Sequence, residues 1–355
     1  MSFESKLQFT IAIPVYNGEP FIKAAIDSVL AQTYPYFEIV VLENGSTDNT
    51  VNIVESYVDS RIRIVSSGQL LPIEANWARI LEIENANEFL VTLCADDILF
   101  PTFLEEIVKA IYEEPKATLY HAKTMIIDAV SKLISTDEAI EYRQDAEGFL
   151  DSFHGSRQIV HGSGYVMHFD DFKAVGGFPA YPGMLFADVW TFYALTLMGY
   201  KVCVQQQLVG WRRHDNAEGN NVKVLKYVEA SKMYLDDLLQ FGYLDDQQRF
   251  SNTRDHVNRL ISRINRSEAK RLIKSPIQTN IEEKTKEWQS TPLYLKKYRT
   301  YVWDLRVDTY WELVKIQSYP IRILAFLILQ IIVGIRYIRS RFFEIINDYS
   351  SSFEV

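Results

Sequence analysis

The sequence predicts an α/β protein whose mainly parallel sheet is flanked by helices. Over the first 130 residues, short apolar runs rich in β-branched residues alternate with longer amphipathic runs. The apolar runs recur about every 25 residues, which is the spacing of successive strand–helix units. Polar motifs directly follow the first, second and fourth runs. Since ligands bind beyond the carboxyl ends of parallel strands, these motifs predict a binding site there.

Five apolar runs are expected to form buried strands. They are FTIAIPV (9–15), FEIVVL (37–42), RIRIV (61–65), FLVTL (89–93) and ATLYHAKTMII (117–127). The segments between them have the spacing of amphipathic helices, over Glu19–Ala31, Thr47–Tyr57, Ile73–Glu84 and Pro101–Glu113. Because a helix joins each strand to the next, neighbouring strands should run parallel.

The pattern weakens from about 130 to 160, where STDEAIEYRQDAEG (135–148) is expected to be a mobile acidic connection. It resumes with GYVMHF, the short helix DDFKAV, the turn GGFP, a helix over Ala187–Met198 and the strand YKVCVQQQLVGW (200–211). Beyond Asn221 charged amphipathic helices continue to about 316. We therefore expect one α/β domain over 1–220, divided into halves at 1–128 and 129–220. A helical C-terminal region over 221–355 should follow.

Composition excludes several classes of protein. The 355 residues are 48% apolar, enough for a large core, and the net charge of −9 argues against a nucleic-acid binder. The two cysteines, Cys94 and Cys203, leave no disulfide framework and fit a reducing compartment. The first residues lack the pattern of a signal peptide. The expected location is the cytoplasm, or the cytoplasmic face of a membrane.

The tail departs from this acidic average. Gln317–Phe343 contains four arginines and no acidic residue, and encloses the uncharged run ILAFLILQIIVGI. This run is shorter than the roughly 20 residues that a spanning helix needs. A helix over 320–343 would suit the membrane interface, with arginines reaching head groups. The alternative is a helix buried against the body or against a partner subunit, as in a homo-oligomer. Both hypotheses stay open.

Two adjacent carboxylates, Asp96 and Asp97, follow the fourth strand. In an extended chain they would point to opposite faces, so one should reach a cation and the other a neighbouring hydroxyl. Oxygen ligands with few protein contacts suit Mg²⁺ or Mn²⁺ completed by substrate phosphates. The alternative is a helix start at Pro101 with Asp97 near its N-terminus.

Polar residues elsewhere allow similar pairs of interpretations. Asp188 starts a helix in an apolar setting, where desolvation raises the pKa of a carboxylate and the helix dipole lowers it. It suits a general base or a helix cap. His214, with Arg212 and Arg213, suits a phosphate contact or an ordinary surface cluster.

Taken in order, four blocks resemble the inverting glycosyltransferases of family 2, which have the GT-A fold. The blocks are IAIPVYNGEPFIKAAIDSVLAQTYPYFEIVVLENGSTDNT, EANWARILEIENANEFLVTLCADDILFP, GGFPAYPGMLFADVWTFYALTLMGY and WRRH, together spanning roughly 8 to 216. The resemblance implies a nucleotide-sugar donor, with a UDP-sugar favoured, bound over the carboxyl edge of a Rossmann-like half. Pro14 and Tyr16 would line the base pocket, with Glu19 close by. Asn44 would face the base edge, and Asn76 of the second block would also bind the donor.

The same resemblance implies the catalytic roles. Asp96 would contact the ribose, and Asp97 would hold Mn²⁺ or Mg²⁺ against the diphosphate. His214 would sit near the diphosphate or the metal, with Arg212 beside it. Asp188 matches the base that takes the proton from the acceptor hydroxyl. The acceptor would be a glycan or a lipid-linked sugar, as in the synthesis of surface polysaccharide.

The chain departs from the family pattern at three positions, Asn44, Cys94 and Ala187. Glu43 and Asn44 stand where acidic residues are frequent, Cys94 where many members have another aspartate, and Ala187 where glutamate is common. Guanine and thymine therefore stay open beside uracil. Two other functions also stay open: a non-catalytic sugar-nucleotide-binding or scaffold protein, and a sugar nucleotidyltransferase. The latter lacks support from a glycine-rich phosphate loop near the first strand.

Overall fold

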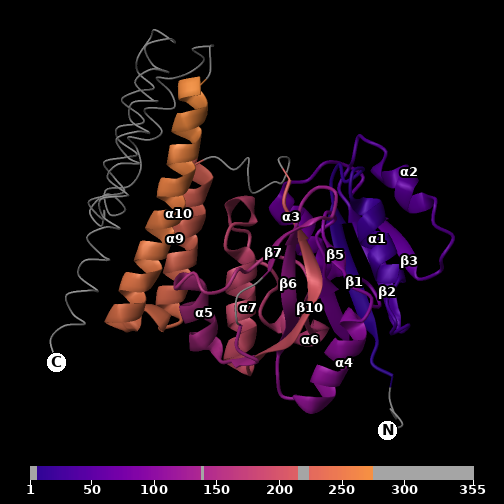
Figure 1. The fold of residues 1–355 in the computed structure, drawn as a ribbon, viewed down its shortest axis with the longest axis horizontal. Helices are drawn as coiled ribbons and strands as arrows, with labels where there is room; N and C mark the ends of the chain where they lie inside the picture. The colour runs from indigo at the N-terminus through magenta and orange to yellow at the C-terminus, as the bar shows by residue number, and fades with distance from the viewer. Residues whose placement is uncertain (1–5, 137–139, 215–223, 275–355) are drawn as a thin grey trace, which may run out of the picture. The chain divides into compact units, whose positions relative to one another are not determined.

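The computed structural model describes residues 6–136, 140–214 and 224–274 (Figure 1). The chain forms two compact units, Met1–His256 and Val257–Val355. The first unit contains the sheet. Helix α10 (Gln247–Lys274) begins in the first unit and continues into the second.

In the described part of the chain, ten strands form one sheet in the order β3-β2-β1-β4-β9-β6-β10-β5, with β7 beside β6 and β8 beside β10. The first four strands in this order are parallel, β9 is antiparallel to both of its neighbours, and β10 is parallel to β6. Their bounds are β1 Phe9–Val15, β2 Phe37–Glu43, β3 Ile62–Ser66, β4 Phe89–Thr92, β5 Ile98–Leu99, β6 Leu119–Ile127, β7 Leu133–Thr136, β8 Arg143–Gln144, β9 Tyr165–His168 and β10 Lys201–Arg212.

Helices cover both faces of the sheet. Adjacent residues of β9 show this: Val166 joins the core packed against α1 and α4, whereas the Tyr165 ring stacks on Phe192 of α7 at 3.8 Å. Neighbouring strand residues point to opposite faces, so α7 lies on the face opposite to α1 and α4. The helices are α1 Ile22–Leu30, α2 Thr50–Glu55, α3 Ile73–Ala78, η1 Arg79–Glu82, α4 Phe103–Glu113, α5 Ala146–His154, α6 Phe169–Ala174, η2 Pro182–Met184, α7 Ala187–Met198, α9 Val224–Gln240 and η3 Tyr243–Asp245.

These elements confirm the predicted α/β class and all five strands of the first 130 residues. The expected mobile connection over 135–148 is wrong for its described residues, because β7, β8 and the start of α5 lie there. Asp145 caps α5 by accepting a hydrogen bond from Gly148 N at 2.8 Å. β7 and β8 are only four and two residues long, so they show no clear periodicity.

The C-terminal predictions are tested only in part. Helices α9 and α10 fit the predicted helical region. The predicted boundary at 220 stays a prediction, because residues 215–223 lie outside the described ranges, as does the proposed interface helix over 320–343. Among the described helices, none has both the length and the apolar character that a membrane crossing requires.

β1 carries the centre of the core, so its loss should be costly. Ile11 is fully buried between the parallel strands β2 and β4. Ile11→Ala should lower the free energy of unfolding by about 2–5 kcal/mol, through lost burial and the cavity left behind. Urea unfolding followed by circular dichroism measures this. Val58→Ala, at a fully exposed position, should change it by less than about 0.5 kcal/mol. Equal midpoints for the two variants would contradict the assignment of β1 to the core.

Candidate active site

The loops after β1 and β2 lie together at the carboxyl edge of the sheet. Asn17 Oδ1 accepts a hydrogen bond from Thr47 N at 2.8 Å, and Glu19 Oε2 accepts one from Asn49 N at 3.0 Å. In return, Glu19 N donates to Asp48 Oδ2 at 3.0 Å. The carboxylate of Glu19 therefore helps to fix one loop against the other, beside the predicted base pocket.

Two predicted nucleotide contacts differ in accessibility. Pro14 is buried within β1, opposite Leu42 of β2. Tyr16, two residues later, is 45% exposed.

Asn44 and Glu43 are held by the protein itself. The Asn44 side chain accepts from Leu71 N and donates to Leu71 O, both at 3.0 Å, and is nearly fully buried. Burial acts to raise the pKa of Glu43, but hydrogen bonds from Ser46 and Ser66 outweigh it and leave that pKa below its ordinary value. Asn44 has one amide hydrogen and one oxygen lone pair left for a base.

Asn76 is also buried, and it belongs to a polar link between α3 and the sheet. Its Oδ1 accepts from Arg79 Nη1 at 2.7 Å. The same Arg79 nitrogen donates to the carbonyl of Glu43 at 2.9 Å. Asn76 therefore contacts the carboxyl end of β2 directly, because its Nδ2 donates to the Leu42 carbonyl at 3.5 Å, and also through Arg79.

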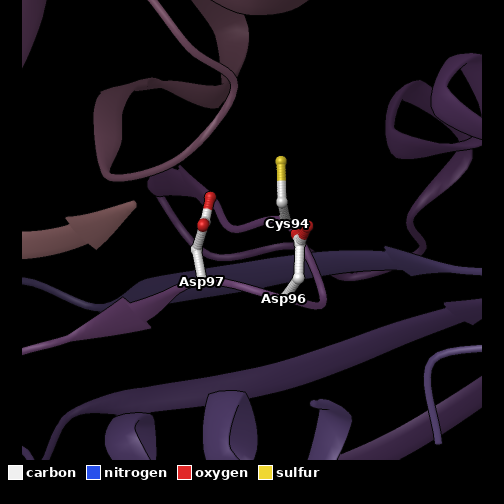
Figure 2. Close-up of side chains that lie close together, drawn as sticks. All are labelled: Cys94, Asp96 and Asp97. Carbon is white, nitrogen blue, oxygen red and sulfur yellow. The ribbon is translucent and has the colours of Figure 1, made fainter. Parts of the chain in front are cut away.

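The acidic pair does not lie in extended chain. β4 ends at Thr92, and a turn carries Asp96 and Asp97 before β5 begins. One ligand atom from each of Cys94, Asp96 and Asp97 lies within 4.8 Å of the other two (Figure 2). The expectation that the aspartates point to opposite faces is therefore wrong, because it assumed that the strand continued through them.

Asp97 is the buried member of the pair. It is 1% exposed; one oxygen accepts from the Ser163 hydroxyl and the other from Arg212 N at 2.7 Å. Burial, followed by the negative charge of Asp96, raises the pKa of Asp97 well above its ordinary value despite these hydrogen bonds.

Asp96 is the accessible member. Its side chain is 31% exposed, and its Oδ2 lies 2.9 Å from Nε2 of His214. The His214 ring packs on Phe21, with centroids 4.6 Å apart. The predicted metal or diphosphate ligand His214 is thus brought together with Asp96 rather than with Asp97.

The Arg212 side chain is directed at protein acceptors. Nε donates to the carbonyl of Asp96 at 2.6 Å, and Nη1 donates to the carbonyl of Asp128 at 3.0 Å and to Ser131 Oγ at 2.9 Å. The residue is nearly fully buried. Arg212 therefore fixes the acidic turn against the turn that follows β6.

Asp188 is the second residue of α7. Its Oδ1 accepts a hydrogen bond from Val189 N at 2.8 Å, and burial raises the pKa of Asp188 to about 6. Burial, with the charges of Asp97, Asp96 and Asp188, also raises the pKa of the Cys94 thiol. Asp188 thus lies near enough to act electrostatically on the same thiol as the acidic pair.

Sequence reasoning missed Ser163, which lies 66 residues from Asp97 in the chain. Its hydroxyl also accepts from Cys94 N at 2.9 Å. A serine in a glycine-rich turn before a strand has no spacing that would reveal such a contact.

The arrangement fits a divalent cation. Asp96 and His214 offer an accessible oxygen and a nitrogen, a donor pair that suits Mn²⁺ and, less well, Mg²⁺. Both oxygens of Asp97 accept hydrogen bonds from the protein, one from Ser163 and one from Arg212 N, and the side chain is buried.

Comparisons with known proteins support the resemblance to the family 2 glycosyltransferases. Residues 10–176 match the model of glycosyl transferase family 2. Over 189 residues the chain is 30% identical to an uncharacterized glycosyltransferase of Rickettsia felis, across 51% of this chain and 30% of that protein. A Haemophilus influenzae relative, also an uncharacterized glycosyltransferase, is 35% identical over 104 residues, across 28% of this chain and 31% of the relative. The matched segments therefore span about a third of these relatives.

The fold is similar to that of a solved glycosyltransferase structure. S. aureus TarS 1-349, in complex with UDP-GlcNAc, superposes with a TM-score of 0.61 at 15% identity, across 87% of this chain and 90% of that chain. This likeness confirms the GT-A-type fold that the sequence resemblance implied.

The bracing role of Arg212 can be measured. Arg212→Lys replaces a planar five-donor group by a single nitrogen, which cannot reach acceptors on both turns. We expect the free energy of unfolding to fall by about 2 kcal/mol in urea titrations, with faster proteolysis at the Asp128–Ser131 turn. Arg213→Lys, at the exposed neighbouring arginine, should leave both measurements near those of the unaltered protein. Identical behaviour of the two variants would contradict the bracing role.

Proposed function

We propose that the protein is a metal-dependent inverting glycosyltransferase, hexosyltransferase-like, that moves a sugar from a nucleotide-diphosphate sugar to an acceptor hydroxyl. One observation carries the proposal: Asp96 Oδ2 lies 2.9 Å from His214 Nε2, beside Cys94 and Asp97, so a partly exposed carboxylate and an imidazole meet at the carboxyl edge of the sheet. The match of residues 10–176 to the model of glycosyl transferase family 2 supports it.

Asp188 would act as the base. Its carboxylate would accept the proton of the acceptor hydroxyl as the oxygen attacks the anomeric carbon, and the bond to the diphosphate would break on the opposite side. This single displacement inverts the anomeric centre without a covalent intermediate. A base with a pKa of about 6 is ionised near neutrality yet basic enough to accept a proton in the transition state.

Asp96 and His214 would hold the cation and, through it, the diphosphate. A bound Mn²⁺ or Mg²⁺ supplies Lewis-acid stabilisation of the charge that develops on the leaving group. Asp97 would keep the acidic turn in place through its hydrogen bonds with Ser163 and Arg212 N. This differs from the sequence prediction, which gave the ion to Asp97 and the ribose to Asp96.

The base of the donor would stack on Tyr16, beside Pro14 and Glu19. The remaining amide hydrogen and lone pair of Asn44 would meet its edge, which keeps a UDP-sugar as the favoured donor. The acceptor would be a glycan or lipid-linked sugar in surface polysaccharide synthesis, reached from the cytoplasmic face of a membrane. The arginine-rich tail motivates this location.

The first experiment screens nucleotide sugars for metal-dependent release of nucleoside diphosphate, with and without glycan acceptors. Turnover that requires Mn²⁺ or Mg²⁺ and gives inverted product would support the proposal. Release of pyrophosphate would instead favour a nucleotidyltransferase. Binding of nucleotide sugar with no turnover across the screen would favour a scaffold or binding protein.

The two aspartates can be separated by isosteric substitutions. Asp96→Asn should weaken Mn²⁺ binding in the presence of UDP at least about 10-fold by calorimetry, with an unchanged urea midpoint. Asp97→Asn should affect mainly the midpoint, because the amide can no longer accept from both Ser163 and Arg212 N. The reverse pattern would restore Asp97 as the ion's ligand.

The base assignment predicts a pH profile. Below pH 6 the Asp188 carboxyl is protonated, so the transfer rate should fall about tenfold per pH unit there and level off above. Asp188→Asn should lower kcat by about 10²–10⁴-fold and leave UDP affinity unchanged. Asp170→Asn, at an exposed acidic residue near the start of α6, should match the unaltered protein. Normal turnover in Asp188→Asn would remove Asp188 from the mechanism.

A further inference from the structure

The loop that leads into Asp188 has an unusual backbone. Met184 and Phe186 have φ angles of 59° and 64°, in the left-handed region that non-glycine residues rarely adopt, and Gly183 between Pro182 and Met184 is at 68°. Such conformations persist only where the surroundings hold them, and they occur often at functional sites. Residues of two helices, α9 and α3, hold this loop.

Helix α9 holds it from one side. The Phe186 ring lies parallel to Tyr234, with centroids 4.9 Å apart and planes inclined by 6°. The Tyr181 hydroxyl donates a hydrogen bond to the carboxylate of Asp237, one helical turn further along. All three rings are buried, so the stacked pair is shielded from water, and Asp237 is half-buried.

Helix α3 holds it from the nucleotide-binding half. Gly183 N donates to the carboxylate of Glu74 on α3. The same helix carries Asn76, which reaches the end of β2 through Arg79. The loop before Asp188 is thus fixed to both the donor half and α9.

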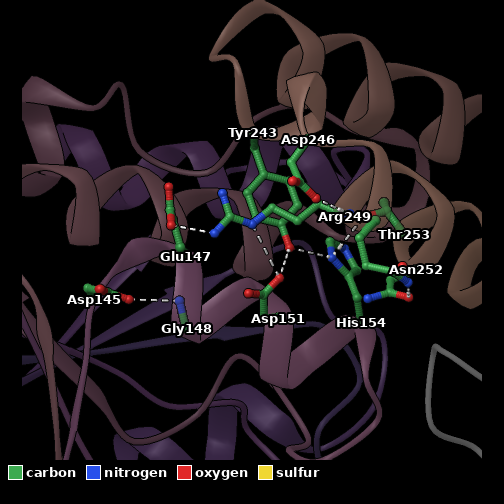
Figure 3. A network of polar contacts seen from close by, with 11 residues as sticks. Asp145, Glu147, Gly148, Asp151, His154, Tyr243, Asp246, Arg249, Asn252 and Thr253 are labelled. Atoms are coloured by element: carbon green, nitrogen blue, oxygen red, sulfur yellow. Dashed lines mark hydrogen bonds and ion pairs between the residues drawn. The ribbon is translucent and has the colours of Figure 1, made fainter.

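Helix α9 is itself anchored in the first unit. The Tyr234 hydroxyl lies 2.9 Å from Nε2 of the buried His154 at the end of α5. The His154 Nδ1 lies 3.2 Å from the Tyr243 hydroxyl, which donates to Asp151 at 2.8 Å, and Arg249 pairs with this cluster as well (Figure 3). Tyr234 is therefore fixed at both its ring face and its hydroxyl.

We propose that Tyr234 and Asp237 of α9 are positioning residues for Asp188, acting through Phe186 and Tyr181. The segment that follows the family match is thereby part of the catalytic apparatus and orients the base toward the acceptor hydroxyl. This inference rests on the proposed function, since it assigns α9 a task in the transfer step rather than in donor binding.

A role confined to packing makes a different prediction. Loss of packing alone would lower stability and leave the kcat of the folded fraction unchanged. Displacement of a base by about 1 Å costs on the order of 10²-fold in rate, while the donor, held elsewhere, binds as before. The test is therefore a separation of kcat from nucleotide affinity.

The experiment compares variants of the full chain at saturating donor and acceptor, after turnover of the unaltered protein is established. Tyr234→Leu and Asp237→Ala should each lower kcat by about 10–100-fold, with the dissociation constant for UDP within about twofold. Tyr234→Phe keeps the stacked ring and should retain kcat within about threefold. Asp236→Asn, at the exposed neighbour of Asp237, is the matched control.

A double-mutant cycle tests the contact directly. Tyr181→Phe is a mild substitution that removes only the hydroxyl, and combined with Asp237→Ala it should lower kcat no further than Asp237→Ala alone. The inference is overturned if Tyr234→Leu and Tyr181→Phe keep full kcat, or if UDP affinity falls in parallel with kcat. Absence of turnover in the unaltered protein across all nucleotide sugars would instead contradict the proposed function.

Discussion

The site depends on the two hydrogen bonds that the buried carboxylate of Asp97 accepts. A carboxylate removed from water is costly unless donors meet its oxygens. Here one donor is Ser163, just before β9, and the other is the backbone of Arg212 at the end of β10. Three segments far apart in the sequence are thereby drawn to one point. The Arg212 side chain extends the link to the turn after β6, so the acidic turn is held from several sides.

This arrangement gives Asp96 and Asp97, two adjacent residues of the same type, different environments. Asp97 is surrounded by protein donors, and its pKa is raised by burial and by the charge beside it. Asp96 keeps partial access to solvent and faces His214. Because Asp96 and Asp97 are consecutive in one short turn, fixing Asp97 also restricts the conformation of Asp96. A ligand at Asp96 therefore meets a carboxylate whose direction was set during folding, which lowers the entropic cost of binding.

The sequence was sufficient for the strands of the first half, since continuous β-branched runs and their spacing reflect burial directly. The sequence also singled out Asp96, Asp97 and Asp188 as candidate metal-binding or catalytic residues. It could not show that the side chains of Asn44 and Arg212 would hydrogen-bond to backbone atoms, because a motif specifies residue types and not their partners. Ser163 carried no signal at all. Long-range hydrogen bonds to single side chains leave no periodic trace, and these are what distinguish the two aspartates.

The loop before Asp188 shows how such a site can rely on a conformation that its own sequence disfavours. A phenylalanine at positive φ costs on the order of 1–3 kcal/mol. Burial of the ring contributes about 1.5–3 kcal/mol, and a parallel aromatic pair about 0.5–1.5 kcal/mol more. Burial alone roughly balances the strain, so the net preference of about 1 kcal/mol for this conformation comes from the stacked pair with Tyr234. Glycine would enter the same region without strain, but it would provide no ring for α9 to hold. The strained phenylalanine therefore couples the place of Asp188 to a helix outside the matched family segment.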